Sequence, residues 1–204
     1  MKFSHLKLEQ IRYNPAAANE VLSGQDGRFS MNRVWYYAVR KFHQSNEDKA
    51  AAFNYFENSI TDHFIASKAN GIKKEQLLVK LNNYFDNYKK LGFEFYDYSN
   101  RISIDINHGN IVSGEIFRFD KLPENKYAIT ILDRDDSIWI KELRYPLFQI
   151  YFSNIFNCPT ENIKVGVYNF QKENHEYESF DEITLKQTEE EVKHISNELN
   201  KIRL

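Results

Sequence analysis

Two aspartates separated by a single residue, Asp133 and Asp135, stand out as groups that could do chemistry. They follow the segment YAITIL, whose composition predicts a strand. Both carboxylates would therefore come at the end of a strand. Carboxylate oxygens bind hard divalent cations and act as general acids or bases. The competing interpretation is a solvated turn in which neither group has a chemical role.

A third acid, Glu57, lies at the margin of an apolar stripe. The stripe belongs to an expected helix at 50–67 and recurs at helical spacing through Phe53, Phe56, Ile60 and Phe64. A carboxylate in this position is usually a surface residue whose stem lies along the apolar face. It is sometimes a metal ligand or an acid–base group, so both interpretations of Glu57 stay open.

Several other chemical signatures are absent from the sequence. It contains no P-loop, no glycine fingerprint for dinucleotides, no HExxH zinc helix and no GxSxG nucleophile elbow. The six histidines include no pair at the i, i+4 ligand spacing. The single cysteine, Cys158, excludes an internal disulfide framework and a four-cysteine zinc or iron–sulfur site supplied by this chain alone.

An expected helix at 31–43 combines cationic and aromatic residues. It carries Arg33, Arg40 and Lys41 together with Trp35, Tyr36 and Tyr37. Cations beside aromatic rings are typical of surfaces that bind nucleic acids. The competing interpretation is a buried aromatic stripe with a solvated basic rim.

The length of 204 residues favours one domain, and the formal net charge of −2 gives no global attraction to nucleic acid or anionic lipid. No apolar run approaches about 18 residues, so we expect no transmembrane helix and no membrane partner. The first residues contain no continuous apolar stretch, so no secretion signal is expected. These features favour a cytoplasmic protein.

The elements that would position the acids lie between residues 101 and 170. Alternating isoleucines and two turn clusters predict an antiparallel meander, and an aromatic run predicts a helix. The expected order is three strands at 101–107, 111–120 and 126–133, a helix at 141–157 and a fourth strand at 163–170. This pattern predicts an α+β core in which the helix covers one face of the sheet.

The remaining segments complete a single expected domain. Residues 1–95 would form a helical N-terminal part that includes a helix at 73–92, with Gly71 ending or interrupting the chain before it. Residues 96–175 would form the sheet core. Residues 176–204 would form a C-terminal helix that starts at a capping box, Thr188–Glu191, and packs either on the core or on a partner.

Five segments follow one another in a recognisable order. They are SMNRVWYYAVRKF, AAAFNYFENSITDHF, VSGEIFRFDKLPENKYAITILD, LFQIYFSNIF and IKVGVYNF. They resemble the early Pro-Arg-x-Tyr-Tyr helix, the ligand-bearing second helix, the Gly-x-x-Asp-Arg … Asp-x-Lys hairpin, the Gln-x-x-x-Tyr helix and the strand after it in the RecB-like branch of the PD-(D/E)xK nuclease superfamily. This resemblance spans nearly the whole chain and implies a restriction-endonuclease-like core.

The resemblance also implies where a metal site would lie. Such nucleases cleave a phosphodiester with water activated at one or two Mg²⁺ ions, which carboxylates hold beside a lysine. Aligned from Gly114, the first aspartate of the family falls on Phe117, and only Arg118 of the Asp-Arg pair survives. The Asp-x-Lys motif falls on Ile131 and Asp133, so neither of its residues matches.

The helix motifs match in part. Tyr151 fits the tyrosine of the Gln-x-x-x-Tyr helix, while the glutamine falls on Leu147 and Gln149 lies two places away. Glu57 is the best candidate for the ligand of the early helix. Two interpretations follow: the fold is retained with an eroded site, or the carboxylates have moved.

A relocated site would use acids near the expected positions. Glu115 and Asp133 keep the strand parity of the expected ligands, whereas Asp120 would point to the face opposite Phe117 if its strand is regular. The relocated site would bind Mg²⁺ or Mn²⁺ through Glu57, Glu115 and Asp133. Asp133 and Asp135 could also act as an acidic pair without the lysine.

The functional expectation is therefore a protein that binds or acts on DNA in recombination, repair or defence against foreign DNA such as phage, alone or with a helicase or nuclease partner. The phosphate contacts would come from Arg33, Arg40, Lys41 and Arg118. We predict little or no cleavage with Mg²⁺. The alternatives are an active metal-dependent DNA nuclease with relocated ligands and a non-enzymatic interaction module.

Overall fold

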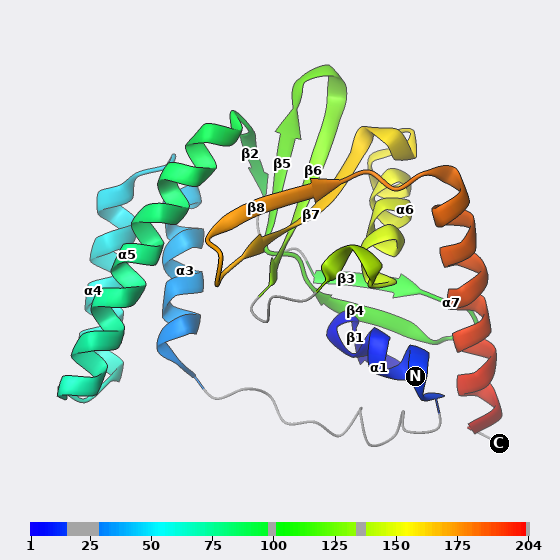
Figure 1. Ribbon diagram of the computed structural model, residues 1–204, viewed down its shortest axis with the longest axis horizontal. Coiled ribbons are helices and arrows are strands. Elements are labelled where there is room, and N and C mark those ends of the chain that lie inside the picture. The colour runs from blue at the N-terminus through cyan, green and yellow to red at the C-terminus, as the bar shows by residue number, and fades with distance from the viewer. Residues whose placement is uncertain (16–28, 98–100, 134–137, 203–204) are drawn as a thin grey trace. The chain divides into compact units, whose positions relative to one another are not determined.

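The computed structural model describes residues 1–15, 29–97, 101–133 and 138–202 (Figure 1). By its internal contacts the chain divides into two compact units. The helical unit is Asp26–Phe93, and the sheet unit combines Met1–Gln25 with Glu94–Leu204. The first residues, expected in a helical part, instead supply strand β1 to the sheet unit.

The helical unit consists of α3 (Met31–Gln44), α4 (Lys49–His63) and α5 (Lys68–Leu91). Its core is aromatic: Phe42 of α3 stacks on Phe85 of α5 with ring centroids 4.2 Å apart. Asp48 is the N-cap of α4. Its carboxylate accepts hydrogen bonds from the backbone N–H groups of Ala50 and Ala51. Gly92 ends α5 in the left-handed conformation, φ 63°, that glycine adopts at low cost.

The start of α5 corrects one expectation. The helix begins at Lys68 and continues through Gly71, where a break was expected. The hydroxyl of Ser67 accepts a hydrogen bond from the backbone N–H of Asn70, at 3.2 Å. This N-terminal cap, worth about 1 kcal/mol, offsets the similar cost of one glycine in the helix interior.

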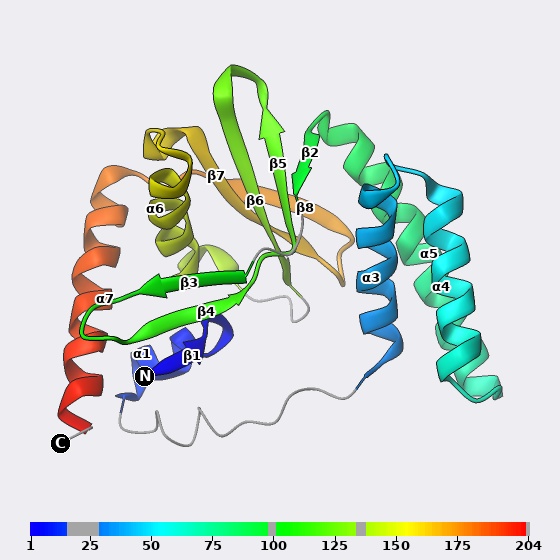
Figure 2. The same ribbon diagram turned by 180° about the vertical axis from the view of Figure 1, so that it is seen from behind.

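The sheet unit contains two mixed sheets, so the fold is α+β. The five-stranded sheet has the order β2-β5-β6-β7-β8, and the three-stranded sheet has the order β1-β4-β3 (Figure 2). The strands of the larger sheet are β2 (Glu94–Asp97), β5 (Arg118–Leu122), β6 (Lys126–Asp133), β7 (Ile163–Asn169) and β8 (Asn174–Glu178). Those of the smaller sheet are β1 (Lys2–Ser4), β3 (Arg101–Asp105) and β4 (Ile111–Glu115).

The expected strand at 111–120 is two strands, β4 and β5, in different sheets. The meander is therefore divided: β3 and β4 form one hairpin, and β5 and β6 form another. The break falls at Ile116 and Phe117, whose side chains are both buried. Glu115 still pairs with Arg101 of β3, whereas the Phe117 N–H already donates to the Thr130 carbonyl oxygen of β6, so the chain passes from one sheet to the other between these residues.

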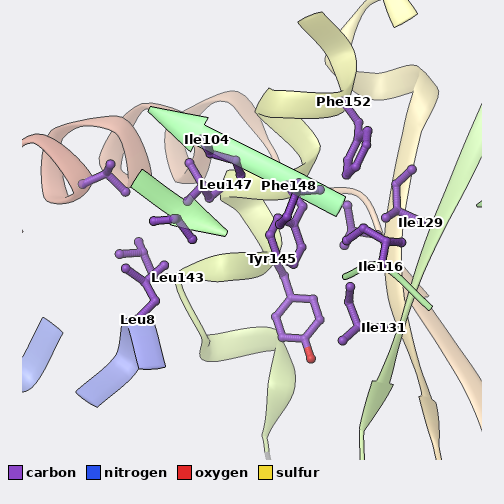
Figure 3. Close-up of a cluster of buried hydrophobic side chains, with 14 of the residues drawn as sticks. Leu8, Ile104, Ile116, Ile129, Ile131, Leu143, Tyr145, Leu147, Phe148 and Phe152 are labelled. Atoms are coloured by element: carbon purple, nitrogen blue, oxygen red, sulfur yellow. The ribbon is translucent and has the colours of Figure 1, made fainter. Parts of the chain in front are cut away.

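Helix α6 (Arg144–Phe156) connects the parallel strands β6 and β7. A crossover helix of this kind packs on the sheet it connects. Figure 3 shows Ile129 and Ile131 of β6 on the side of the sheet that faces Tyr145, Phe148 and Phe152 of α6. The same core takes in side chains from the smaller sheet, so the two sheets share one apolar interior.

Helix α7 (Glu182–Ile202) also differs from its expected start. Asp181 precedes it and accepts a hydrogen bond from the backbone N–H of Thr184, at 2.7 Å. Thr188, expected in a capping box, lies inside the helix and donates to the Thr184 carbonyl oxygen. The apolar stripe of α7 packs on the core of its own unit through Val192, Ile195 and Leu199.

Within the part of the chain that the structure describes, no helix is both long enough and apolar enough to span a membrane.

Candidate functional site

A buried polar site of the sheet unit surrounds Arg118, on β5. Asp120, two residues further along the same strand, lies on the same face and is fully buried. The Nε of Arg118 donates to both carboxylate oxygens of Asp120, at 2.7 and 3.0 Å. Arg118 itself is 1% exposed. A buried ion pair of this kind is stable only when further hydrogen bonds satisfy the remaining donors.

Three neighbours supply those hydrogen bonds. One terminal nitrogen of Arg118 donates to Tyr177 Oη at 2.9 Å and to Thr130 Oγ1 at 3.3 Å. The other lies 3.3 Å from His175 Nε2. Because a guanidinium only donates, this imidazole nitrogen accepts and the ring proton is on Nδ1. We call Arg118, Asp120, Thr130, His175 and Tyr177 the Arg118 cluster.

The titration of the cluster follows from its burial. Burial, with a smaller contribution from the Arg118 cation, lowers the pKa of His175 to about 2. Burial also raises the pKa of Tyr177 to about 12. At neutral pH the imidazole and the phenol are therefore both uncharged. The only formal charges of the cluster are those of the Arg118–Asp120 pair.

Strand register explains how the cluster assembles. Arg118, Thr130, Gly166 and Tyr177 are consecutive partners in one row across β5, β6, β7 and β8. A Cβ on Gly166 would lie 2.0 Å from the backbone oxygen of Glu176 and 2.6 Å from the Tyr177 ring. Glycine at this position therefore allows β8 and Tyr177 to approach.

The two positions at which the sequence resemblance places metal ligands are apolar and buried. Phe117 is 3% exposed and stacks on Tyr168 with ring centroids 6.5 Å apart. Ile131 is also 3% exposed and belongs to the apolar core beside Tyr145 (Figure 3). Neither side chain offers an oxygen or nitrogen to a cation, so these positions do not fit a divalent metal.

Asp133, the last residue of β6, is 5% exposed. Burial is the main cause that raises the pKa of the Tyr145 phenol, and the nearby carboxylates of Glu142 and Asp133 add to the effect. Asp133 therefore lies close enough to Tyr145 to act on it electrostatically. Glu115 ends β4 in the other sheet, is half exposed and has Arg101 Nε 3.8 Å from its carboxylate.

The other predicted acids are placed as follows. Glu57 belongs to α4 of the helical unit, where its carboxylate pairs with Lys74 Nζ at 3.3 Å. Asp120 is held by Arg118 and is not offered to a cation. Asp135 lies outside the described residues. Among residues 1–15, 29–97, 101–133 and 138–202, no three or more His, Cys, Asp or Glu side chains group closely enough to hold a metal ion.

Two residues of α6, Tyr151 and Gln149, were considered for the Gln-x-x-x-Tyr motif. Tyr151 is half-buried, packs against the core and stacks edge-on with Phe152. Gln149 is fully buried, and its amide nitrogen donates to the backbone oxygens of Thr160 and Phe180, each at 3.1 Å. Its amide oxygen accepts from the Phe180 N–H at 2.8 Å. Gln149 therefore clamps the two segments that flank β7 and β8 onto α6.

A second buried polar group was not predicted from the sequence. Arg144, at the start of α6, pairs with Glu142 at 2.6 Å and lies 3.4 Å from His5 Nδ1. Burial, assisted by the Arg144 cation, lowers the pKa of His5 to about 3. A Cβ on Gly114 would lie 2.1 Å from the His5 ring. The glycine inside a strand was the one signal in the sequence that something approaches closely there.

The aromatic residues of the cationic helix α3 lie on different faces. Trp35 is fully buried, whereas Tyr36 and Tyr37 are only partly buried. Arg33 and Arg40 lie over the Tyr37 ring, each with its guanidinium carbon 5.7 Å from the ring centroid. Lys41 is exposed. Arg118, predicted with them as a phosphate contact, is instead buried in its ion pair, so this expectation is corrected.

Comparison with solved structures finds a similar fold in a crystal structure from Eubacterium rectale, to which an exonuclease role is provisionally ascribed. The TM-score is 0.56 at 10% sequence identity, over 97% of this chain and 78% of that chain. At this identity the likeness concerns the fold alone, and it is consistent with a nuclease-like fold. No family model matches the chain, and no curated protein matches it.

Proposed function

We propose that this protein is a RecB-like member of the PD-(D/E)xK nuclease fold that binds DNA and has lost most or all of its cleavage activity. The setting we propose is recombination, repair or defence against foreign DNA, alone or with a helicase or nuclease partner. The observation that carries the proposal is a nuclease-like fold in which the expected metal positions, Phe117 and Ile131, are buried apolar residues.

The state of a neighbouring acid, Asp120, supports the loss of cleavage. Asp120 lies three residues after Phe117, yet its carboxylate accepts two hydrogen bonds from the buried Arg118 guanidinium. To bind a divalent cation, Asp120 would have to break this pair and leave the arginine charge buried without its partner. Breaking a buried pair costs several kcal/mol, so Arg118 makes Asp120 a poor metal ligand.

The DNA-binding part of the proposal rests on α3. Its sequence contains two arginines and one lysine and has no acidic residue. The arginines are held over tyrosine rings, which keeps guanidinium planes and aromatic rings together on one face. Cations of this kind bind phosphates without reading sequence, and aromatic rings add sequence-tolerant contacts with bases.

We expect no detectable cleavage of single- or double-stranded DNA with Mg²⁺ or Mn²⁺. The measurement is a nuclease assay of the parent protein beside Glu115→Ala and Asp133→Ala. These two acids are the ones in the sheet unit that a relocated site would need. Without a carboxylate at position 117 or 131, the sheet unit has no pair of oxygen ligands at the expected places.

Clear cleavage by the parent that disappears in both variants would contradict an eroded site and support a relocated one. Cleavage that persists in both variants would indicate a contaminating enzyme or another site. Repeating the assay on an independently purified preparation would distinguish these two explanations. Either result would leave the DNA-binding part of the proposal to its own test.

We expect the double charge reversal Arg33→Glu/Arg40→Glu to weaken DNA binding by at least about tenfold at moderate salt. Each cation that neutralises a phosphate adds roughly 0.7 to 0.9 to the slope of log affinity against log salt concentration. The parent should therefore show the steeper slope. Fluorescence anisotropy with a labelled oligonucleotide at several salt concentrations measures both quantities.

The matched control is Lys68→Glu/Lys73→Glu, which changes the net charge by the same amount on exposed residues of α5. This control should retain most of the affinity and the parent slope. An equal loss in both double variants would mean that net charge alone governs binding. A salt-independent affinity of the parent would contradict a phosphate site on α3.

A further inference from the structure

One face of α3 combines four side chains in a regular arrangement. Arg33, Tyr36, Tyr37 and Arg40 occupy positions i, i+3, i+4 and i+7, which lie on one side of a helix. We call these four residues the Arg–Tyr face. The opposite side of the helix, with Val34, Trp35, Ala38, Val39 and Phe42, is buried in the core.

The contacts within this face bring planar groups together. The guanidinium carbon of Arg40 lies 5.9 Å from the Tyr36 ring centroid and 5.7 Å from that of Tyr37. Arg33 lies over Tyr37 as well, and its Nε donates to Tyr37 Oη at 3.0 Å. The two tyrosine rings meet edge to face, with centroids 5.6 Å apart.

We propose that the Arg–Tyr face recognises single-stranded nucleic acid by stacking unpaired bases on Tyr36, Tyr37 and the arginine planes. This inference rests on the proposed function, because it names the class of nucleic acid that the basic helix takes. Tyrosine rings and guanidinium planes are among the protein groups on which unpaired bases stack.

The chemistry distinguishes a single strand from its competitors. In a duplex the base faces are stacked on one another, so the arginines meet phosphates and groove edges while the tyrosine rings find no open base face. An acidic peptide would likewise use the arginine charges and leave the rings unused. A single strand offers phosphates and free base faces together, and it therefore matches both components of the face.

The test compares Tyr36→Ala/Tyr37→Ala with Tyr36→Phe/Tyr37→Phe. The alanine variant should weaken binding of a labelled oligothymidylate by about tenfold or more, the size expected when base stacking is lost. The phenylalanine variant keeps the rings and should bind within about twofold of the parent. Binding of a duplex of equal charge, and competition by polyglutamate, should be the same for all three proteins.

The matched control is Tyr55→Ala, an exposed tyrosine on α4 of the same unit, which should bind as the parent does. A second measurement needs no variant: 2-aminopurine placed in the oligothymidylate should lose fluorescence on binding the parent protein, because stacking on an aromatic ring quenches it. This measurement tests base stacking by the protein even if the alanine variant does not fold.

Equal losses for single strand and duplex in the alanine variant, or unquenched 2-aminopurine in the bound complex, would overturn the stacking proposal while leaving DNA binding intact. Failure of the parent to bind either DNA would overturn the proposed function itself, and the stacking proposal with it. The two failures therefore give different results in one set of measurements.

Discussion

Replacing Arg118 by alanine is expected to lower the free energy of unfolding by about 3 to 5 kcal/mol. The substitution leaves the Asp120 carboxylate, which is fully buried, without the cation that donates to both its oxygens. It also removes donors from Thr130 and Tyr177. Urea unfolding followed by circular dichroism measures the change, which should appear in the midpoint.

The double variant Arg118→Met/Asp120→Leu should recover most of that loss, because it removes both charges and refills the space with apolar atoms. The matched surface control is Lys126→Ala, which breaks the solvent-exposed pair between Lys126 and Glu124 and should leave the unfolding midpoint unchanged. If Arg118→Ala behaved like the surface control, the Arg118–Asp120 pair would have no structural role.

Replacing Gly166 by alanine should lower the free energy of unfolding by about 1 to 3 kcal/mol, the range for overpacking a tight site. The added Cβ would meet the backbone oxygen of Glu176 at 2.0 Å, and a backbone atom of a paired strand cannot turn aside as a flexible side chain can. Strands β7 and β8 would have to separate. The Tyr177 hydroxyl would then withdraw from Arg118.

The control for this prediction is Gly71→Ala, which should stabilise the protein by about 0.5 to 1 kcal/mol. Gly71 is inside α5, and apart from its chain neighbours and the adjacent helix backbone no atom of the described residues lies within 4 Å of a Cβ built on it. The same chemical change is therefore expected to have opposite signs at the two glycines, as measured by thermal or urea unfolding. A Gly166→Ala protein as stable as the parent would show that β8 can shift without cost.

Local patterns predicted several elements well. The amphipathic stripes of α3 and α4, the helix at α6 and the strands β3, β6 and β7 appear close to their expected ranges. These elements are encoded by nearby residues, because periodic burial and turn chemistry act over only a few positions. The stop of α5 at Gly92 follows the same rule.

The places where prediction failed involve partners that are distant in the chain. Strand β1 forms only by pairing with β4, about one hundred residues away, and the polar strand β8 forms only against β7. Strand β1 has only three residues and β8 contains a single large apolar side chain, Tyr177, so neither is long or apolar enough to be predicted by itself. The start of α7 was misplaced because Asp181, which accepts from the Thr184 N–H ahead of the expected capping box, was not considered as a cap.

The sequence by itself determined which residue types stand at the candidate metal positions, since Phe117 and Ile131 are apolar in any conformation. Only the tertiary structure decided what the neighbouring polar residues do. Arg118 was expected on the surface, and cross-strand register placed it in a buried ion pair with Asp120. Burial of a charge depends on which strands lie beside it, and that depends on long-range pairing that no local pattern records.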